Sequence, residues 1–372
     1  MVERKYTFDI REDVLAMAPY VPVEPPEVWA QRLGIPAAAL VKLDANENPY
    51  GPSPRALAAL AALDQAHIYP DPSQRTLRAR LGQWLGIDSE RLLAGAGSDE
   101  LIDLILRLVL RPGDAVIDCP PTFGMYRFCT AVSGGLVRSV PRRSDFSLDL
   151  EAIEAAAQDG QAKVLFVTSP NNPDGSPAPP EAIARLLRLP LLVVVDEAYI
   201  EFAGRPSLMQ QGLEAENLVV LRTFSKWAGL AGLRLGYGLF PPALLEHLWK
   251  IKQPYNINAA AAAAAIASLD DVGLLMDRVA QLVVAREQLQ QALAGFPFLR
   301  PFPSQSNFVL CRVVGRPARP LWEALRRQGI LVRYFDQQGL QDCIRISAGT
   351  PQQIEALLVA LRRVEVESGS AS

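Results

Sequence analysis

The feature of this sequence that most constrains its fold is a set of short, almost uninterrupted apolar runs. Four of them follow one another along the chain: AVIDC at 115–119, KVLFVTS at 163–169, LLVVVDEAY at 191–199 and LVVLRTFSK at 218–226. Continuous Val, Leu and Ile are typical of parallel strands that are buried on both faces. Helical patterns lie between several runs, at 149–158 and 180–189. The alternation predicts a layered α/β domain around a mostly parallel sheet.

The rest of the chain predicts a second, smaller domain. Helical patterns cover 27–33, 54–63 and 76–85, and another follows the GAGSDE loop, for which Ser98 is a candidate N-cap. The alanine tract after 257 opens one long helical region, and strand-like NFVLCRV, ILVRYF and CIRIS then alternate with helices at 321–328 and 351–364. We expect an N-terminal arm with part of the small domain at 1–50, a large domain at 51–270 and a small α+β domain at 271–372.

Composition argues against several classes of function. The formal net charge of −3 provides no bulk field that would attract nucleic acid or an anionic membrane. Two histidines, and four cysteines without a CxxC pair, do not predict a metal site. The charged N-terminus lacks the apolar segment of a signal peptide, and no apolar run reaches the roughly 18 residues of a membrane span. We expect a cytoplasmic protein.

Two cations stand out because no carboxylate near them in the sequence neutralises them. Lys226 and Arg234 share the apolar stretch TFSKWAGLAGLRLGYG. We expect an anionic ligand to supply the missing partners. A phosphate dianion fits, because the GAGSDE loop opens a helix whose N-terminal N–H groups cradle phosphate, and Ser98 and Ser225 add hydroxyl groups.

Further polar residues follow the apolar runs, where ligands bind in open α/β sheets. Asp196 follows the apolar part of the run at 191–199, and a buried carboxylate keeps a pyridine nitrogen protonated. Asn172 and Tyr199 provide neutral donors for a ring oxygen. A lysine in a desolvated, cationic setting has a lowered pKa, so the neutral amine of Lys226 attacks an aldehyde. The ligand predicted by these groups is pyridoxal 5′-phosphate.

A family resemblance covers nearly the whole chain. It is carried by the blocks LDANENPYGPSP, YPDPSQRTLR, GAGSDEL, PPTFGMYR, SPNNPDG, DEAYIEF, RTFSKWAGLAGLRLGYG, PYNIN, SQSNFVL and IRISAGT. With these blocks the sequence resembles the fold-type I pyridoxal-phosphate aminotransferases, and within them the histidinol-phosphate aminotransferase family. The resemblance implies a large domain with a mostly parallel sheet between helices, and a smaller α+β domain.

The resemblance also implies roles for residues around the cofactor. Lys226 would bond to the cofactor aldehyde and then move a proton during the reaction. Phe123 would stack on the ring, and Asp99 would offer its backbone N–H to the phosphate beside Ser98. Tyr69 would reach the phosphate of the other subunit's cofactor, which implies a homodimer.

For the substrate, the resemblance implies a clamp of two arginines. Arg345 would hold the anionic group, with Arg333 and Tyr20 contributing from the small domain and the arm. A bidentate arginine suits both a phosphate and a carboxylate, so one site would serve histidinol phosphate and glutamate in turn.

The predicted reaction exchanges an amino group between L-histidinol phosphate and 2-oxoglutarate, a step of histidine biosynthesis. An aromatic or broad-specificity aminotransferase, or a phosphothreonine decarboxylase on a similar frame, remains as an alternative. A non-catalytic regulator would be expected to have lost Lys226, Asp196 or Arg345, and all three are present. A nucleotide-binding oxidoreductase would need a GxGxxG motif, which GAGSDE does not match.

Overall fold

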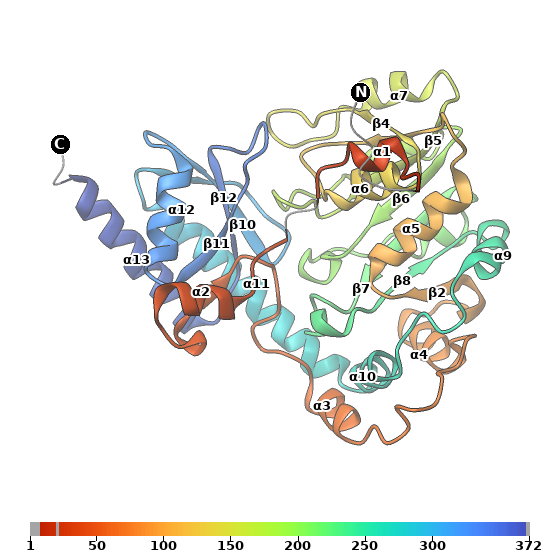
Figure 1. Ribbon diagram of the computed structural model, residues 1–372, viewed down its shortest axis with the longest axis horizontal. Helices are drawn as coiled ribbons and strands as arrows, with labels where there is room; N and C mark the ends of the chain where they lie inside the picture. Colours follow the sequence, from red (N-terminus) through yellow and green to blue (C-terminus); the bar gives the residue numbers. More distant parts are fainter. Residues whose placement is uncertain (1–7, 20–21, 370–372) are drawn as a thin grey trace.

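The computed structural model describes residues 8–19 and 22–369, with side chains as far as residue 366. The strands in these ranges form two sheets, one of seven strands and one of five. The sheets belong to two bodies that lie side by side, with α11 (Val272–Ala294) extending from one into the other (Figure 1).

The larger sheet has the strand order β2-β8-β7-β6-β5-β3-β4. Its strands are β2 (Leu92–Gly95), β3 (Ala115–Asp118), β4 (Leu136–Ser139), β5 (Ala162–Thr168), β6 (Leu192–Asp196), β7 (Leu218–Thr223) and β8 (Gly236–Leu239). The strands from β3 to β7 pair in parallel, and β8 is antiparallel to both of its neighbours. The predicted mostly parallel sheet, and the α/β class with it, is therefore confirmed.

Helices cover both faces of this sheet because alternate strand residues point to opposite sides. In β6, Val193 and Val195 pack toward one helical layer, whereas Val194 packs toward the other. The first layer contains α3 (Pro54–Ala61), α4 (Arg75–Leu85), α7 (Leu150–Ala157), α8 (Pro180–Leu186) and α10 (Ala259–Asp270). The second contains α5 (Ser98–Val109), α6 (Met125–Val132) and α9 (Pro242–Ile251).

The smaller sheet has the order β1-β11-β12-β10-β9. Its strands are β1 (Val41–Leu43), β9 (Leu299–Pro301), β10 (Phe308–Val313), β11 (Ile330–Tyr334) and β12 (Cys343–Ser347). Its body also contains α2 (Pro26–Leu33), α12 (Ala318–Arg327) and α13 (Pro351–Gly369), whereas α1 (Glu12–Leu15) lies near α6 (Figure 1). Since β1 pairs in parallel with β11, part of the N-terminal segment belongs to this sheet. The domain limits at 50 and 270 stay predictions.

The single helical region predicted after 257 is wrong in its extent, because it is two helices. α10 and α11 meet at Asp271 with a bend of 84°. The Asp271 carboxylate accepts a hydrogen bond from the backbone N–H of Arg55 at 3.1 Å, which ties the bend to the start of α3. Alanine periodicity carries no signal for such a contact. Within the described ranges, no single helix is long and apolar enough to cross a membrane. The bent pair of α10 and α11, taken together, reaches the length and apolar composition of a membrane span, on these two criteria alone.

Strands β6 and β7 end earlier than the apolar runs predicted, because side chains near their ends bond back to the backbone. The Asp196 carboxylate accepts a hydrogen bond from Ala198 N–H at 3.0 Å, and the Thr223 hydroxyl accepts one from Ser225 N–H at 3.1 Å. Short side-chain bonds of this kind compete with strand pairing. Polar residues of DEAY and TFSK therefore lie in turns at the carboxyl edge of the sheet.

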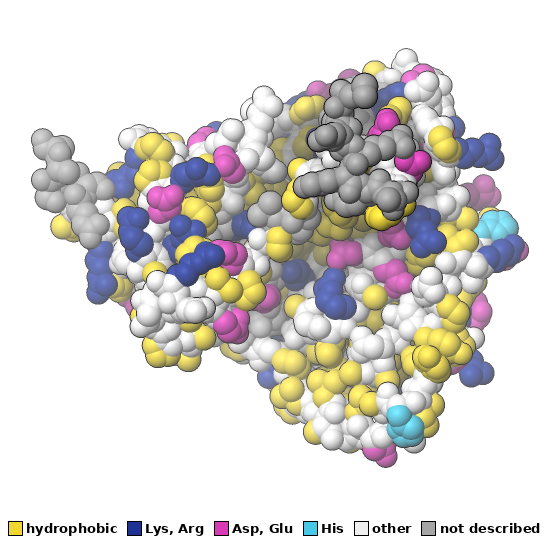
Figure 2. Space-filling model, viewed as in Figure 1, with side chains coloured by type: hydrophobic (Ala, Val, Ile, Leu, Met, Phe, Trp, Pro, Cys, Tyr) yellow, Lys and Arg dark blue, Asp and Glu magenta, His cyan; other side chains and the backbone are white. Residues whose placement is uncertain are grey.

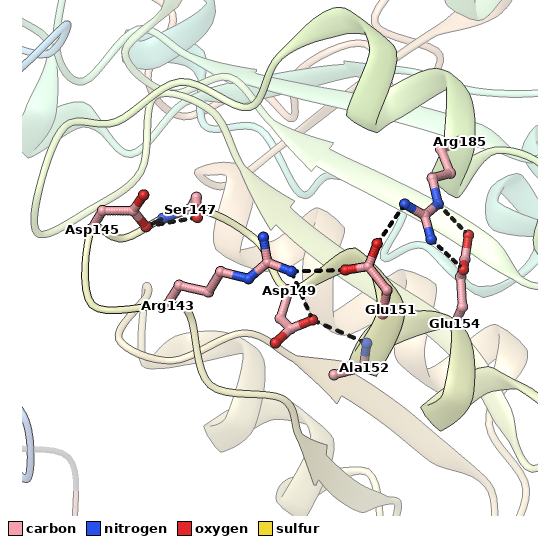
Figure 3. A network of polar contacts seen from close by, with 8 residues as sticks. All are labelled: Arg143, Asp145, Ser147, Asp149, Glu151, Ala152, Glu154 and Arg185. Carbon is pink, nitrogen blue, oxygen red and sulfur yellow. Dashed lines mark hydrogen bonds and ion pairs between the residues drawn. The ribbon is translucent and has the colours of Figure 1, made fainter.

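A surface network of ion pairs ties α7 to α8 and to the loop before α7 (Figure 3). Arg185 contacts Glu154 at 2.6 Å and Glu151 at 2.9 Å. Arg143 contacts the same Glu151 at 2.7 Å and Asp149 at 3.3 Å. Because water and salt screen exposed pairs, this network orders the loop rather than providing a large part of the stability.

A buried ion pair lies beneath the turn that follows β6. The Arg222 guanidinium on β7 lies 2.6 Å from Glu201, and the two side chains are only 7% and 3% exposed. The guanidinium also lies 5.0 Å from the ring of Trp84 and 5.7 Å from that of Tyr237. Nearby Glu197 is buried as well, and burial raises its pKa to about 7. Arg222 is thus the cation that compensates two carboxyl groups in the core.

We expect Arg222→Met to lower the free energy of unfolding by about 3–5 kcal/mol, because it leaves buried carboxylates without their cation. Urea unfolding at pH 8 would measure the loss. The surface variant Arg185→Met is the control and should change the stability much less. Equal losses for the two variants would contradict the role assigned to the buried pair.

Candidate active site

A cavity of about 530 Å³ lies between the two sheets, at the carboxyl edge of the larger one. Most of the predicted site residues line it, namely Ser98, Asp99, Phe123, Asn172, Asp196, Tyr199, Ser225, Lys226, Arg234, Arg333 and Arg345. In Figure 2 this face is hollowed between the two bodies, and basic and acidic side chains gather in the hollow. The fold thus brings together residues from segments far apart in the sequence.

Asp196 lies at the end of β6 and is 3% exposed. Its carboxylate accepts hydrogen bonds from the Tyr126 hydroxyl at 2.8 Å and from Ala198 N–H at 3.0 Å. Burial raises the pKa of Asp196 to about 6, because the loss of water outweighs these two donors. A carboxylate held only by neutral donors is suited to a cationic group of a ligand.

Lys226 follows β7, and its Nζ donates a hydrogen bond to the Ala45 carbonyl at 3.1 Å. Burial, together with the positive charges of Arg345 and Arg234, lowers the pKa of Lys226 to about 8. A large part of this lysine is therefore neutral near pH 8, and a neutral amine is the nucleophilic form.

The start of α5 forms a concave group of N–H donors and hydroxyls. Gly97, with φ of +80°, precedes the helix, and Ser98 is its first residue, so the prediction that Ser98 is the N-cap is wrong by one position. Ser225 lines the same cavity, and its hydroxyl accepts a hydrogen bond from the Thr223 hydroxyl at 3.0 Å. The Arg234 guanidinium bonds to the Asp99 carboxylate at 2.8 Å. The interpretation that only a ligand could neutralise Arg234 is therefore wrong, because its partner comes from another segment.

The two arginines of the predicted substrate clamp sit opposite one another in the smaller sheet, since Arg345 on β12 pairs with Arg333 on β11. Arg345 is 6% exposed and donates to the side-chain oxygen of Asn172 and, at 2.8 Å, to the Asp44 carbonyl. Asn172 also lines the cavity, and because its side-chain oxygen is bonded to Arg345, its amide nitrogen is the remaining hydrogen-bonding group of that side chain. Arg345 of the predicted substrate clamp and Asn172, a predicted donor to the cofactor, therefore hold each other in position.

Of the two remaining predicted residues, only Tyr69 is described. Tyr20 is outside the described residues. Tyr69 is 78% exposed and stacks on Tyr255 with ring centroids 4.4 Å apart, away from the residues that line the cavity of its own chain. Within the described ranges, no group of three or more His, Cys, Asp and Glu side chains is arranged to hold a metal ion.

Two further residues that contact predicted site residues were missed by sequence reasoning. Tyr126, fully buried, donates to Asp196 and lies 5.6 Å from the ring of Phe123 in an edge-on arrangement. Its position in the PPTFGMYR block, three residues after Phe123, was the available signal. Asn46, 1% exposed, contacts Tyr199 through its side chain. No local pattern marks that contact.

Comparison with known proteins identifies the family. The aminotransferase class I and II family model matches residues 38–361. The histidinol-phosphate aminotransferase of Roseiflexus castenholzii is 52% identical over 363 residues, covering 95% of this chain and 98% of the relative. The chain belongs to the histidinol-phosphate aminotransferase family.

Other members of the histidinol-phosphate aminotransferase family are similar over the same span. The chloroplastic enzyme of Nicotiana plumbaginifolia is 51% identical over 354 residues, covering 95% of this chain and 86% of the relative. The crystal structure of the Sinorhizobium meliloti enzyme, in complex with pyridoxal-5′-phosphate, has a TM-score of 0.87 at 31% identity and covers 97% of each chain. The predicted fold-type I class and the predicted enzyme class are confirmed.

The raised pKa of Asp196 predicts a pH-dependent stability of the cofactor-free protein. Since the folded-state pKa of about 6 exceeds the ordinary value of 3.8, folding favours the protonated group, and stability is lost as pH rises from 4 through 6. Relative to Asp196→Asn, which does not titrate, the wild type should lose on the order of 3 kcal/mol between pH 4 and pH 7. Urea unfolding at both pH values measures this difference, and parallel behaviour of the two proteins would contradict the assignment.

Proposed function

We propose that this protein uses pyridoxal 5′-phosphate to exchange an amino group between L-histidinol phosphate and 2-oxoglutarate, giving imidazole acetol phosphate and L-glutamate. The observation that carries the proposal is a buried lysine with a lowered pKa and a buried carboxylate with a raised pKa in one cavity. Similarity to histidinol-phosphate aminotransferases over 95% of the chain supports the choice of substrate.

The residues present fit this cofactor. A phosphate needs unfilled space beside the backbone N–H groups at the start of α5. We call this space the phosphate nest, and two glycines keep it open. A Cβ atom on Gly236 would lie 2.3 Å from Ser98 N, and one on Gly97 would lie 2.6 Å from the Arg234 guanidinium. The unfilled space therefore has N–H, hydroxyl and guanidinium groups around it, which is the donor set that binds a phosphate dianion.

Each of the predicted site residues has a separate role in this reaction. When pyridoxal 5′-phosphate is bound, the chemistry it supplies is electron withdrawal from the carbon atom that carries the amino group. Asp196 keeps a proton on the ring nitrogen, since its buried carboxylate favours a cationic neighbour. Asn172 and Tyr199 donate to the ring oxygen, and Phe123 covers a ring face. Lys226 would hold the cofactor through its aldehyde group, and the Nζ of Lys226 would carry the proton that leaves and returns to the amino-bearing carbon.

Arg345 and Arg333 bind the anionic end of each substrate in turn. Histidinol phosphate carries a phosphate and no carboxylate, whereas glutamate carries two carboxylates, and a guanidinium pairs with either. Tyr20 keeps its predicted part in this clamp. A single set of cations therefore serves both halves of the reaction.

A homodimer completes the proposal. The exposed Tyr69 would enter the partner subunit's phosphate site, which accounts for a large aromatic side chain that is 78% exposed in the single chain. The cytoplasmic location predicted from the sequence stays a prediction.

The test is a half-reaction. Protein loaded with pyridoxal 5′-phosphate is mixed with L-histidinol phosphate, phenylalanine, tyrosine or phosphothreonine, and the visible absorbance of the bound cofactor is followed. We expect the fastest change with histidinol phosphate, and none in Lys226→Ala. A faster change with an aromatic amino acid would favour the aromatic aminotransferase, and release of CO₂ from phosphothreonine would favour the decarboxylase. No change with any donor would contradict an aminotransferase.

Gly236→Ala tests the phosphate nest. The added methyl group would displace the first turn of α5, so we expect the affinity of the cofactor-free protein for pyridoxal 5′-phosphate to fall about tenfold or more. Absorbance titration measures the affinity. Gly273→Ala is the matched control, because a Cβ atom there meets nothing within 4 Å. Equal affinities for the two variants would exclude the nest.

A further inference from the structure

Asn46 is a buried residue that neither the predicted catalytic set nor the substrate clamp contains. It lies just after β1, it is 1% exposed, and it lines the cavity. Its backbone φ of +55° is in the left-handed region, which Asn tolerates better than most residues other than Gly. The backbone conformation accounts for an Asn or a Gly at this position but does not account for where the side chain points.

The side chain of Asn46 is oriented by Ser347 at the end of β12. The Ser347 hydroxyl accepts a hydrogen bond from Asn46 N–H at 2.9 Å and donates its own hydrogen to the Asn46 side-chain oxygen at 3.0 Å. Asn307 also holds the segment, because its amide donates to the Asn46 carbonyl at 3.0 Å. With the side-chain oxygen occupied by Ser347, the Asn46 Nδ2 group faces away from β12.

That Nδ2 group donates to the Tyr199 hydroxyl oxygen at 3.1 Å. A phenol that accepts a hydrogen bond on one side has its own hydrogen free to point to another acceptor. Tyr199 is 5% exposed, so bulk water does not readily take that hydrogen. The remaining direction is the cavity, toward which Tyr199 presents its surface.

We propose that Asn46 is a positioning residue that makes Tyr199 a hydrogen-bond donor toward the ring oxygen of the cofactor. This inference rests on the proposed function and deepens it. Asn46 belongs to the segment that continues from the smaller sheet, whereas Tyr199 follows β6 of the larger sheet, so the contact links the two sheets at the cavity. The neighbouring Ala45 carbonyl accepts from Lys226, so the same segment also holds the lysine.

The effect on the cofactor has a definite sign. The ring oxygen carries negative charge, and it loses one hydrogen bond when the lysine nitrogen bonded to the cofactor loses its proton. A donor from Tyr199 compensates for that loss and so lowers the pH at which the nitrogen is deprotonated. Weakening the donor should therefore raise that pH.

The experiment is a pH titration of the visible absorbance of the protein loaded with pyridoxal 5′-phosphate. Asn46→Gly is the main variant, because glycine accepts the positive φ without strain. We expect the titration midpoint to rise by about half a pH unit or more, which corresponds to one neutral hydrogen bond. Tyr199→Phe should raise it at least as much, and the double variant should show no further rise.

Asn48→Ala is the matched control from the same segment. Asn48 is also buried, but its amide donates to the Trp227 carbonyl at 3.0 Å rather than to Tyr199. Thermal unfolding of the cofactor-free proteins should show destabilisation in this control, whereas its absorbance midpoint should stay at the wild-type value.

The outcomes separate this inference from the proposed function. An unchanged midpoint in Asn46→Gly, or a shift that persists in the Tyr199→Phe background, would overturn the role of Asn46 while leaving the cofactor in place. An equal shift in Asn48→Ala would reduce Asn46 to a structural residue and overturn the inference as well. A wild-type protein that acquires no visible band with pyridoxal 5′-phosphate would instead overturn the proposed function itself.

Discussion

The structure of the site depends on one carboxylate, Asp196, which the fold buries at the end of a strand and surrounds with neutral donors. Burial in this setting raises its pKa to about 6, so the folded chain alone holds the charged form at a cost. A cationic partner from outside the chain removes that cost. The parallel sheet makes the arrangement possible, because the carboxyl ends of β5, β6 and β7 present their polar turns along one edge.

Burial also disfavours the charged form of Lys226, the cation in the same cavity. Lys226 sits in the same cavity with its pKa lowered to about 8, mainly by burial and then by Arg345. Arg345 and Arg234 keep their own partners, Asn172 with the Asp44 carbonyl and Asp99 respectively. These partners hold both guanidinium groups near Lys226. A positive charge near the lysine lowers its pKa and so favours its neutral, nucleophilic form.

A short segment after β1 makes polar contacts with both bodies at the cavity. Residues after β1 lie between β12 and the turn that follows β6, and their carbonyl and amide groups reach Arg345, Lys226 and Tyr199. Small displacements of the second body therefore act directly on groups around the cofactor site. The N-terminal part of the chain, which the sequence predicted to include an arm, therefore contributes residues to the active site.

The sequence by itself determined the α/β class, the strands β3, β5, β6, β7, β10, β11 and β12 and the types of residue at the site, because hydrophobic periodicity and strand-end turns are local properties. It missed the short strands β1, β2, β4, β8 and β9. It misjudged the ends of β6 and β7 and the break at Asp271, where side chains bond to backbone. Only the tertiary structure decided which groups meet: Arg234 with Asp99 and Asn46 with Tyr199 join residues 135 and 153 positions apart. The first pair depends on how α5 packs beside β8 within the larger body, and the second depends on how the two sheets close over one cavity. No local pattern encodes either arrangement.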